Sequence, residues 1–330
     1  MSGKFNNRVL LIIFGVLAAI FVITRFTTVK RSNQTLRSEL VTIDTSRVTG
    51  IKLYPRADRD SELIFRKEQD GWTVTGDGVT AAASEQSVRN ALTELHDMEA
   101  EQLVARSPEK WAQYQVNDSL GTRLVLLEGE KTLLDLMVGR FTYQPVQGGN
   151  QMYGYGQNQG TAYSYVRLSD EEEVYSVEGF LSMSLNQPFS RWRDQTLTRL
   201  NTGQLQKIIY DYPADTGFVA ERSQGKWMVA GLMADSASME RFVNGLARRT
   251  HNTFADDFKA PGEADFTMTL EGENMQTHQV KGYAESDSLM IVESTYNPGA
   301  YFRLELSDVR KDLFPSAGRL IGGENEEAPF

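Results

Sequence analysis

The chain contains Ile51-Lys-Leu-Tyr-Pro55, and a similar stretch returns later as Ile209-Tyr-Asp-Tyr-Pro213. A repeated order of short stretches is typical of a duplicated structural unit. The sequence therefore predicts two tandem homologous units, with Trp72 and Trp227 as repeated core anchors. Four further pairs recur in the same order: Gly71-Trp-Thr-Val74 and Lys226-Trp-Met-Val229, Asn90-Ala-Leu92 and Asn244-Gly-Leu246, Glu128-Gly-Glu130 and Glu271-Gly-Glu273, and Tyr165-Val-Arg-Leu168 and Tyr301-Phe-Arg-Leu304.

Each predicted unit consists of short strands crossed by one amphipathic helix. Ser84 is expected to cap the first helix and Ser236 the second, each ahead of apolar residues at helical spacing. Turns such as Asp70-Gly71 are too short for parallel crossovers, so the sheets should be antiparallel and the fold α+β. The apolar helix positions are Val88, Ala91, Leu92 and Leu95, and then Met239, Phe242, Val243 and Leu246.

The first unit carries two insertions relative to the second. One lies around Ser107–Val116, where Pro108-Glu-Lys-Trp111 predicts a helical turn. The other lies within Phe141–Gly160, in a segment rich in Gly, Gln and Asn. Tyrosines on such a polar backbone are typical of binding loops, although a hairpin tip without a role has the same composition. The candidate partner or ligand loop holds Tyr143, Tyr153, Tyr155 and Tyr163.

The first unit closes with Phe189-Ser-Arg-Trp-Arg-Asp194. Trp192 is expected to pack between the two repeats, while Arg191, Arg193 and Asp194 make polar links. We interpret this segment as a candidate inter-repeat clasp and not as a catalytic group.

Composition limits the classes of function. The chain has 330 residues, no cysteine and a formal net charge of −10. Residues 38–330 hold 28 Lys and Arg against 44 Asp and Glu, a formal charge of −16. An acidic body argues against nucleic acid as a partner. Without cysteine, disulfides, zinc–thiolate sites and thiol catalysis are excluded.

An apolar segment near the N-terminus predicts a membrane anchor. Val9–Ile23 is an unbroken apolar run, and residues 7–26 reach the length that a helix needs to cross a bilayer. A cleaved signal peptide is the alternative, but small residues are missing after the apolar run. Basic residues flank both sides of the span. Because long domains translocate largely regardless of charge, we expect the body outside the cytoplasm.

The sequence offers little sign of catalysis. None of the three histidines belongs to a metal-ligand spacing, and neither a nucleophile elbow nor a phosphate-binding loop occurs. Two acidic clusters, 170–173 and 256–257, leave open paired-carboxylate chemistry or, for the second, calcium binding, while solvated turns are the simpler interpretation. We therefore predict no enzyme activity, no catalytic residues, no metal and no cofactor.

These observations divide the chain into five regions. They are a cytoplasmic tail and transmembrane anchor at 1–27, a stalk at 28–43, a first α+β repeat at 44–200, a second at 201–321, and a disordered tail at 322–330.

Several motifs together resemble a bacterial family of membrane-anchored periplasmic proteins, the domain of unknown function 4340. The resemblance covers roughly residues 44–320, with Gln115-Val116 departing from the Gly-Leu of the family. Members are often encoded beside the genes of ABC transporters, including those of gliding-motility type. The motifs are Tyr114-Gln-Val116, Leu136-Met-Val-Gly139, Tyr165-Val-Arg167, Val174-Tyr175, and Phe189 with Arg193-Asp194-Gln-Thr-Leu197.

The resemblance implies an accessory extracytoplasmic subunit and supplies no catalytic residues. We therefore expect a non-enzymatic, single-pass protein of the cytoplasmic (inner) membrane, held in lipid by residues 7–26. Its partner would be a membrane protein such as an ABC-transporter permease. One alternative is a carbohydrate- or peptide-binding module that uses the Tyr143–Tyr163 loop, and a second is an envelope hydrolase with paired carboxylates.

Overall fold

The computed structural model describes residues 43–56, 61–96, 98–145, 160–213 and 216–323. The expected anchor at 7–26 lies outside these residues, as do most of the expected stalk and tail. Within the described ranges no helix has the length and apolar character required to span a membrane.

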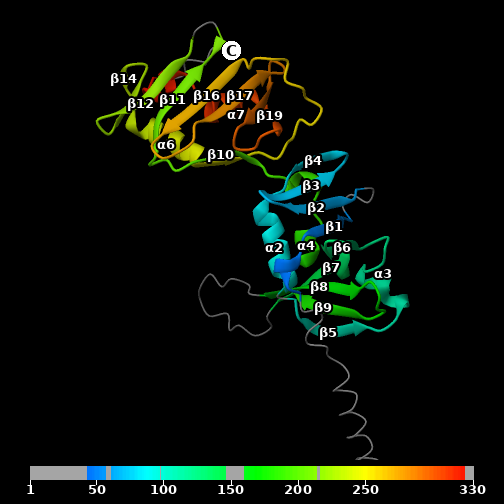
Figure 1. Ribbon diagram of the computed structural model, residues 1–330. Coiled ribbons are helices and arrows are strands. Elements are labelled where there is room, and N and C mark those ends of the chain that lie inside the picture. Colours follow the sequence, from blue (N-terminus) through cyan, green and yellow to red (C-terminus); the bar gives the residue numbers. More distant parts are fainter. Residues whose placement is uncertain (1–42, 57–60, 97, 146–159, 214–215, 324–330) are drawn as a thin grey trace, which may run out of the picture. The chain divides into compact units, whose positions relative to one another are not determined.

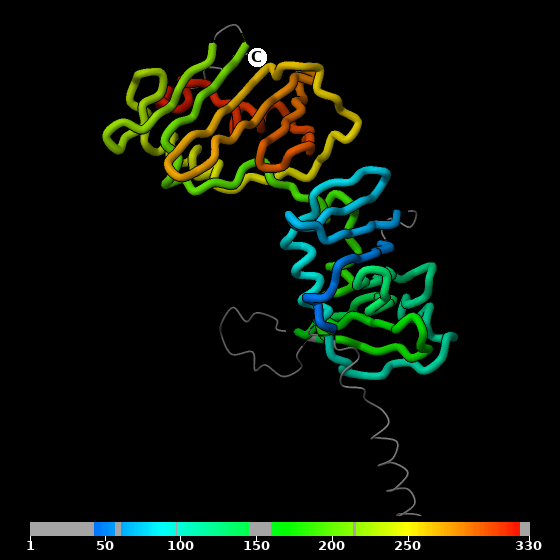
Figure 2. Tube along the Cα trace, viewed as in Figure 1, coloured from blue at the N-terminus to red at the C-terminus, as the bar shows by residue number. Residues whose placement is uncertain are grey.

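Antiparallel sheets make up most of the fold, with few helices, so the α+β class is confirmed (Figure 1). The tube trace shows each large sheet drawn from one continuous part of the chain (Figure 2). The first sheet has the order β4 (Val79–Ala82), β3 (Gly71–Gly76), β2 (Leu63–Glu68), β1 (Gly50–Tyr54), β6 (Thr122–Glu128), β7 (Lys131–Pro145), β8 (Gly160–Leu168), β9 (Val174–Glu178), β5 (Ala100–Ala105). The second has the order β14 (Leu232–Met233), β13 (Lys226–Val229), β12 (Phe218–Ser223), β11 (Leu205–Asp211), β16 (Phe266–Gly272), β17 (His278–Ala284), β18 (Leu289–Ser294), β19 (Tyr301–Glu305).

The remaining elements are short apart from two helices of twelve residues, α2 and α6. β10 (Thr196–Arg199) and β15 (Arg248–Thr250) form a separate two-stranded sheet. The predicted helical turn at Pro108 is confirmed by η2 and α3. The helices are η1 (Thr45–Arg47), α2 (Glu85–His96), η2 (Pro108–Lys110), α3 (Trp111–Tyr114), α4 (Leu181–Leu185), α5 (Phe189–Trp192), α6 (Ser236–Ala247), α7 (Leu306–Asp312) and α8 (Ala317–Leu320).

By compactness the chain divides into two units. The first comprises the described residues of Met1–Glu62 and Arg89–Gln187, and the second those of Leu63–Val88 and Pro188–Phe330. The hairpin strands β2 to β4 therefore group with the C-terminal half of the chain.

Eight strands follow the same order in the two large sheets, while β5 extends the first sheet beyond β9 and β15 pairs with β10 outside the second. Each begins in the chain with its fourth strand, β1 or β11, and first adds three strands toward one edge. The long helix α2 or α6 follows, then a short strand, β5 or β15. Four more strands are then added on the other side of β1 or β11. In the chain, α2 and β5 lie between β4 and β6, and α6 and β15 likewise lie between β14 and β16.

The register of the central strands differs by one residue from the match of Ile51 with Ile209. Ile51 lies opposite Leu126 and is buried, whereas on β11 the buried residue opposite Leu270 is Ile208. Ile209 points to the other face and is only half-buried. Because side chains alternate along a strand, a shift of one residue exchanges the two faces.

One proposed equivalence is wrong. Tyr165–Leu168 lies on β8, the third strand counted from the β5 edge. Tyr301–Leu304 lies on β19, at the edge of its own sheet. In strand order β19 corresponds to β9 and β8 to β18. The shared Tyr-x-Arg-Leu pattern reflects the alternation of any half-buried strand.

The cap of α6 also corrects the sequence prediction. Ser84 does cap α2, since its Oγ accepts a hydrogen bond from the Ser87 amide at 3.3 Å. At α6, however, Asp235 accepts the hydrogen bond from the Ser238 amide at 2.8 Å, and Ser236 is the first helical residue. A carboxylate there also faces the positive end of the helix dipole.

The predicted helix faces are buried. Val88, Ala91 and Leu95 of α2 are each at most 4% exposed, and Leu92 is half-buried. In the second unit, α6 packs its apolar face into a core built from the eight-stranded sheet, α7 and α8. That core includes Phe302 and Phe314, both fully buried. The four predicted positions of α6, Met239, Phe242, Val243 and Leu246, all lie in it.

Candidate functional site

The predicted tyrosine loop extends from a paired stem. β7 and β8 remain in register as far as Pro145 opposite Gly160. Tyr143 lies opposite Ala162 and Tyr163 opposite Thr142, so the two tyrosines are on opposite faces of the stem. Tyr153 and Tyr155 lie outside the described residues. The two described tyrosines do not form one binding face.

Tyr143 belongs instead to an apolar patch in the first unit. Its ring packs over Gly160, where a Cβ atom would overlap the phenol. Phe141 lies on the same face of β7 two residues earlier, and its ring centroid is 6.1 Å from that of Phe180. Met183 follows Phe180 by about one helical turn. We call Phe141, Tyr143, Phe180 and Met183 the apolar patch; each is between 38% and 52% exposed.

Two hydrogen bonds made by Ser164 hold α4 against β8 under this patch. Ser164 Oγ donates to the Gly179 carbonyl at 3.1 Å and accepts from the Ser182 amide at 3.2 Å. Leu181 and Leu185 are buried on the inner side of α4. Since these contacts fix the helix, Phe180 and Met183 are presented from a rigid element.

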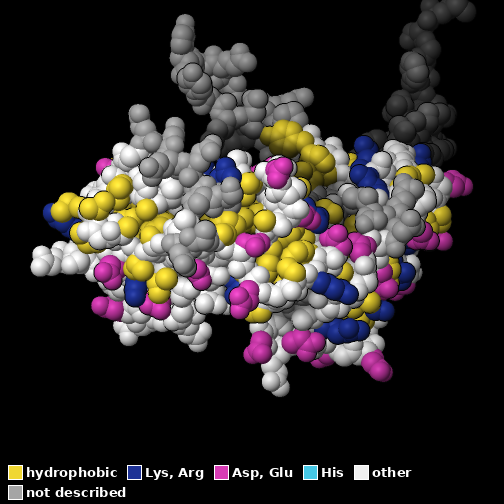
Figure 3. Space-filling model, turned by 90° about the horizontal axis from the view of Figure 1, so that it is seen from above, with side chains coloured by type: hydrophobic (Ala, Val, Ile, Leu, Met, Phe, Trp, Pro, Cys, Tyr) yellow, Lys and Arg dark blue, Asp and Glu magenta, His cyan; other side chains and the backbone are white. Residues whose placement is uncertain are grey.

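Sequence reasoning missed three residues of the patch, Phe141, Phe180 and Met183. A signal was present in Phe180-Leu-Ser-Met-Ser-Leu185, because a short helix with apolar residues on opposite sides cannot bury all of them. On the face shown in Figure 3, exposed hydrophobic side chains lie among both acidic and basic ones.

The candidate clasp makes a dense set of contacts, all within the second unit. Arg193 is buried, pairs with Asp256 at 2.7 Å, and has its guanidinium 3.6 Å from the ring centroid of Phe254. Its main chain forms a bridge with Ala83. Trp192 is buried and packs edge-on against Phe65 at 5.1 Å.

The other two clasp residues differ in their surroundings. The Asp194 carboxylate accepts hydrogen bonds from the amide and hydroxyl of Thr196, and its carbonyl accepts one from Asn297 at 2.6 Å. Arg191 is exposed. The structure thus gathers Trp192, Arg193 and Asp194 into contacts, while Arg191 faces solvent.

The two repeated tryptophans take matching places beside a hairpin turn. Trp72 lies opposite Lys67 and Trp227 opposite Arg222, each one residue from the pair that closes the turn. Trp72 is buried, whereas Trp227 is half-buried and lines a cavity of about 340 Å³ with Met233, Glu240 and Asn244. The Arg222 guanidinium lies 5.2 Å from the Trp227 ring centroid.

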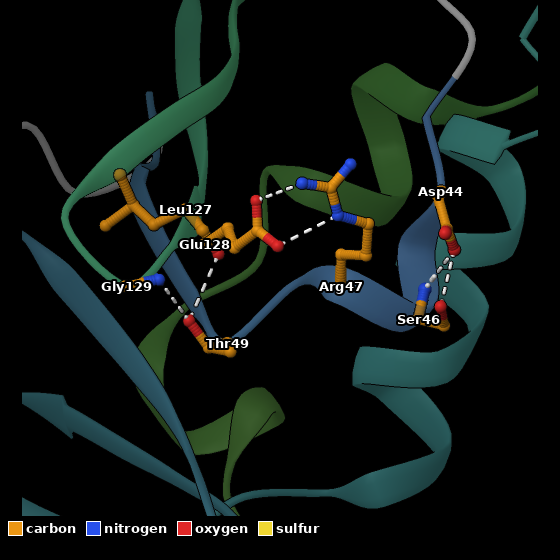
Figure 4. A network of polar contacts seen from close by, with 7 residues as sticks. All are labelled: Asp44, Ser46, Arg47, Thr49, Leu127, Glu128 and Gly129. Carbon is orange, nitrogen blue, oxygen red and sulfur yellow. Dashed lines mark hydrogen bonds and ion pairs between the residues drawn. The ribbon is translucent and has the colours of Figure 1, made fainter.

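Residues near the start of the first described range form a polar network, shown in Figure 4. Arg47 reaches both oxygens of Glu128, with Nε to Oε1 at 2.8 Å and Nη2 to Oε2 at 2.5 Å. Thr49 Oγ1 accepts from the Gly129 amide at 2.7 Å. The hydrogen bond with Arg47 holds the pKa of Glu128 below its ordinary value. Asp44 caps η1 through the Ser46 amide, and hydrogen bonds from Ser46 likewise lower its pKa.

A similar pair fastens β6 to β7. Arg123 makes two hydrogen bonds to the Asp135 carboxylate, with Nε to Oδ1 at 3.0 Å and Nη2 to Oδ2 at 2.6 Å, and Ser169 donates to it as well. The hydrogen bond with Arg123, aided by Ser169, lowers the pKa of Asp135.

Both residues of the second acidic cluster are engaged in ion pairs. Asp256 binds Arg193, and Asp257 lies 3.4 Å from Arg303. In the described ranges no group of three or more His, Asp or Glu side chains is placed to hold a metal ion.

Four of the five motifs that carry the family resemblance meet in one cluster, and the fifth is the clasp segment. The rings of Tyr114 and Tyr165 pack at a tilt of 58° with centroids 4.7 Å apart, and Val116, Met137 and Val174 are buried beside them. Gly139 lets the strand approach the Tyr114 carbonyl, with which a Cβ atom would overlap. These residues serve packing.

Arg167 sits at this cluster without an acidic partner. Its Nε donates to the Val116 carbonyl at 3.1 Å, and its Nη1 donates to the carbonyls of Leu168, Ser169 and Glu171. The guanidinium also lies 3.9 Å from the Trp111 ring centroid. Burial lowers the pKa of Arg167, yet four carbonyls accept hydrogen bonds from its Nε and Nη1, which marks a structural role.

Comparison with known proteins gives one match. Searches among curated proteins and among solved structures each returned none. The family described as Domain of unknown function (DUF4340) matches residues 72–266, which is more than half of the chain. This span includes the cluster around Tyr114 and Tyr165, the apolar patch and the clasp. The chain therefore belongs to the DUF4340 family.

Proposed function

We propose that this protein is a non-enzymatic accessory or scaffold subunit of an envelope complex, anchored by residues 7–26 with its body outside the cytoplasm. The apolar patch would be the surface that docks a membrane-protein partner. Family resemblance favours an ABC transporter as that complex.

The exposure of the patch is the observation that carries this proposal. Contiguous exposed apolar side chains on soluble domains commonly mark interaction surfaces. Aromatic residues and Met are also enriched where proteins meet. The patch combines two phenylalanines, a tyrosine and a methionine, held on β7 and α4.

We further propose that the two sheets descend from one duplicated module. Their common strand order supports this, as does the shared place of Trp72 and Trp227 beside a turn. Duplication would leave two similar scaffolds whose surface loops are free to diverge.

Co-purification tests the docking surface. The tagged full chain is extracted from membranes in detergent, and partners are compared for wild type and for Phe180→Ser combined with Met183→Ser. Because both side chains are about half exposed, the change should leave folding intact and lose the partner, with binding weakened tenfold or more.

The matched control is Leu232→Ser combined with Met233→Ser. These side chains are 58% and 61% exposed but lie on β14, far along the chain from the patch. The control should retain the partner. Equal recovery from patch and control variants would contradict docking through the patch.

The absence of cysteine allows a direct test of topology. A single Ser223→Cys substitution introduces a thiol at the exposed turn between β12 and β13. We expect a membrane-impermeant maleimide to label it in intact spheroplasts. Labelling only after lysis would place the body in the cytoplasm and refute this part of the proposal.

The second candidate is a carbohydrate- or peptide-binding module, and the Trp227 cavity favours it more than the tyrosine loop does. Its size of about 340 Å³ falls in the range of small-ligand sites, and a half-buried indole lies among polar groups. Trp227→Ala and deletion of residues 144–160 separate the two locations in a binding screen with glycan and peptide arrays. Loss of a ligand in the first variant alone would assign the cavity.

A further inference from the structure

A small cavity in the second unit is lined by basic side chains from several elements. It measures about 210 Å³ and lies among α6, α7 and α8. Arg241 comes from α6, Arg249 from β15, Lys311 from α7 and Arg319 from α8. Four cations converge here in a body that is acidic as a whole.

One carboxylate shares the cavity. Asp312 pairs with Arg249 Nη1 at 2.6 Å, and both side chains are about a quarter exposed. Arg249 Nε is buried and has no hydrogen-bond partner among the described residues. Asp312 neutralises one of the four cations, so the lining keeps a formal charge of about +3.

The other three cations are not held by carboxylates. Among the described residues Arg241, Lys311 and Arg319 make no ion pair, and Asp235 is the acidic group that Arg241 senses electrostatically. A basic residue in the last turn of a helix offsets the helix dipole, which accounts for Lys311. Arg319 likewise lies in the last turn of the short helix α8, whereas Arg241, within α6, has no such role.

Arg241, Lys311 and Arg319 are exposed, so water screens much of their mutual repulsion, and together they leave a positive rim around the cavity that attracts an anion. Gly245 lies beside Arg249 on the cavity wall, where a Cβ atom would come within 3.3 Å of its guanidinium. The glycine leaves room at the basic wall.

We propose that this cavity binds a phosphate monoester group. A phosphate carries close to two negative charges near neutral pH and several acceptor oxygens, which suits forked guanidinium donors and one ammonium. The volume admits a phosphate with a small substituent but no larger ligand. Inorganic phosphate and phosphatidate, the phospholipid whose headgroup is a phosphate monoester, share this chemistry.

Titration calorimetry of the purified full chain with inorganic phosphate tests the site. We expect saturable binding that weakens about tenfold in Arg319→Ala, with a similar loss in Lys311→Ala, because each removes one of three uncompensated charges. Arg248→Ala is the matched control, since Arg248 is exposed on β15 next to Arg249 but does not line the cavity. It should bind as the wild type does.

Asp312→Asn should change the phosphate affinity in the opposite direction. Removing the only carboxylate in the lining should tighten phosphate binding severalfold, whereas a purely structural pair would yield only a less stable protein. If that variant fails to fold, comparing phosphate binding by Arg319→Ala and by Arg248→Ala still tests the site. No saturable binding by the wild type, or equal loss in the control, would overturn the proposal.

Short-chain phosphatidate distinguishes the sources of the phosphate. Tighter binding of this lipid than of inorganic phosphate, lost in Arg319→Ala, would identify a phospholipid headgroup. Weaker or equal binding would identify a soluble phosphate compound. Both outcomes keep the cavity as a phosphate site.

Discussion

Asp256→Ala should destabilise the second unit more than Arg193→Met, although Asp256 is the more exposed partner. Arg193 is 3% exposed and Asp256 38% exposed across their 2.7 Å contact. Removing the carboxylate leaves a buried guanidinium without a counter-charge, which typically costs about 3–5 kcal/mol. Because Phe254 still faces the cation, we expect a value near the lower end, about 3 kcal/mol.

The reverse change leaves a carboxylate that water can reach. Methionine fills much of the volume of Arg193, so the loss is one hydrogen bond and the cation contacts with Phe254 and Phe189. Together these amount to about 1–2 kcal/mol. The two variants should differ in unfolding free energy because only Asp256→Ala leaves a buried charge without a partner.

Urea unfolding followed by tryptophan fluorescence measures both variants, since Trp192 packs on Phe65 next to the pair. With a urea dependence of about 1–3 kcal/mol per molar, Asp256→Ala should lower the midpoint by about 1 M or more. In the Arg193→Met background, Asp256→Ala should cost almost nothing further. An equal cost in both backgrounds, or a smaller cost for Asp256→Ala than for Arg193→Met, would refute the reasoning.

Three further outcomes are expected. Gly139→Ala should cost more than about 2 kcal/mol by thermal unfolding, because the new methyl would overlap the Tyr114 carbonyl; an unchanged melting temperature would contradict the close approach. Asp235→Ala should lower the melting temperature more than Ser236→Ala does, because the Asp235 carboxylate is the cap of α6; the reverse order would restore the serine as the cap. The pKa of Asp135 is lowered in the fold, so its contribution is present above its ordinary pKa of 3.8 and is lost as the pH falls through the lower folded value; Asp135→Asn should therefore flatten the acid limb of a stability–pH curve, and a parallel curve would refute this.

Periodicity was enough to predict the fold class and most elements. The apolar spacing of Val88, Ala91 and Leu95 located α2, and that of Met239 to Leu246 located α6. Short turns such as that between β6 and β7 indicated antiparallel pairing. These signals are local, so one sequence contains them.

Register and exposure are not local, and there the sequence misled. Ile51 and Ile209 look alike, yet Ile208 is the buried counterpart, because a partner strand decides which face is covered. Tyr143 and Tyr163 belong to one loop by composition, yet pairing puts them on opposite faces. The exposure of Phe180 likewise depends on how Ser164 holds α4, a contact that spacing cannot reveal.

The network around Arg47 has a mechanical consequence. A pull on the chain ahead of Asp44 would load the Arg47–Glu128 pair and the Thr49–Gly129 hydrogen bond before it reached the ladder between β1 and β6. Side-chain links would therefore yield first, at low force, while the sheet stayed whole. The ladder between β1 and β6, and the core that it covers, would be protected from a force applied at this end of the fold.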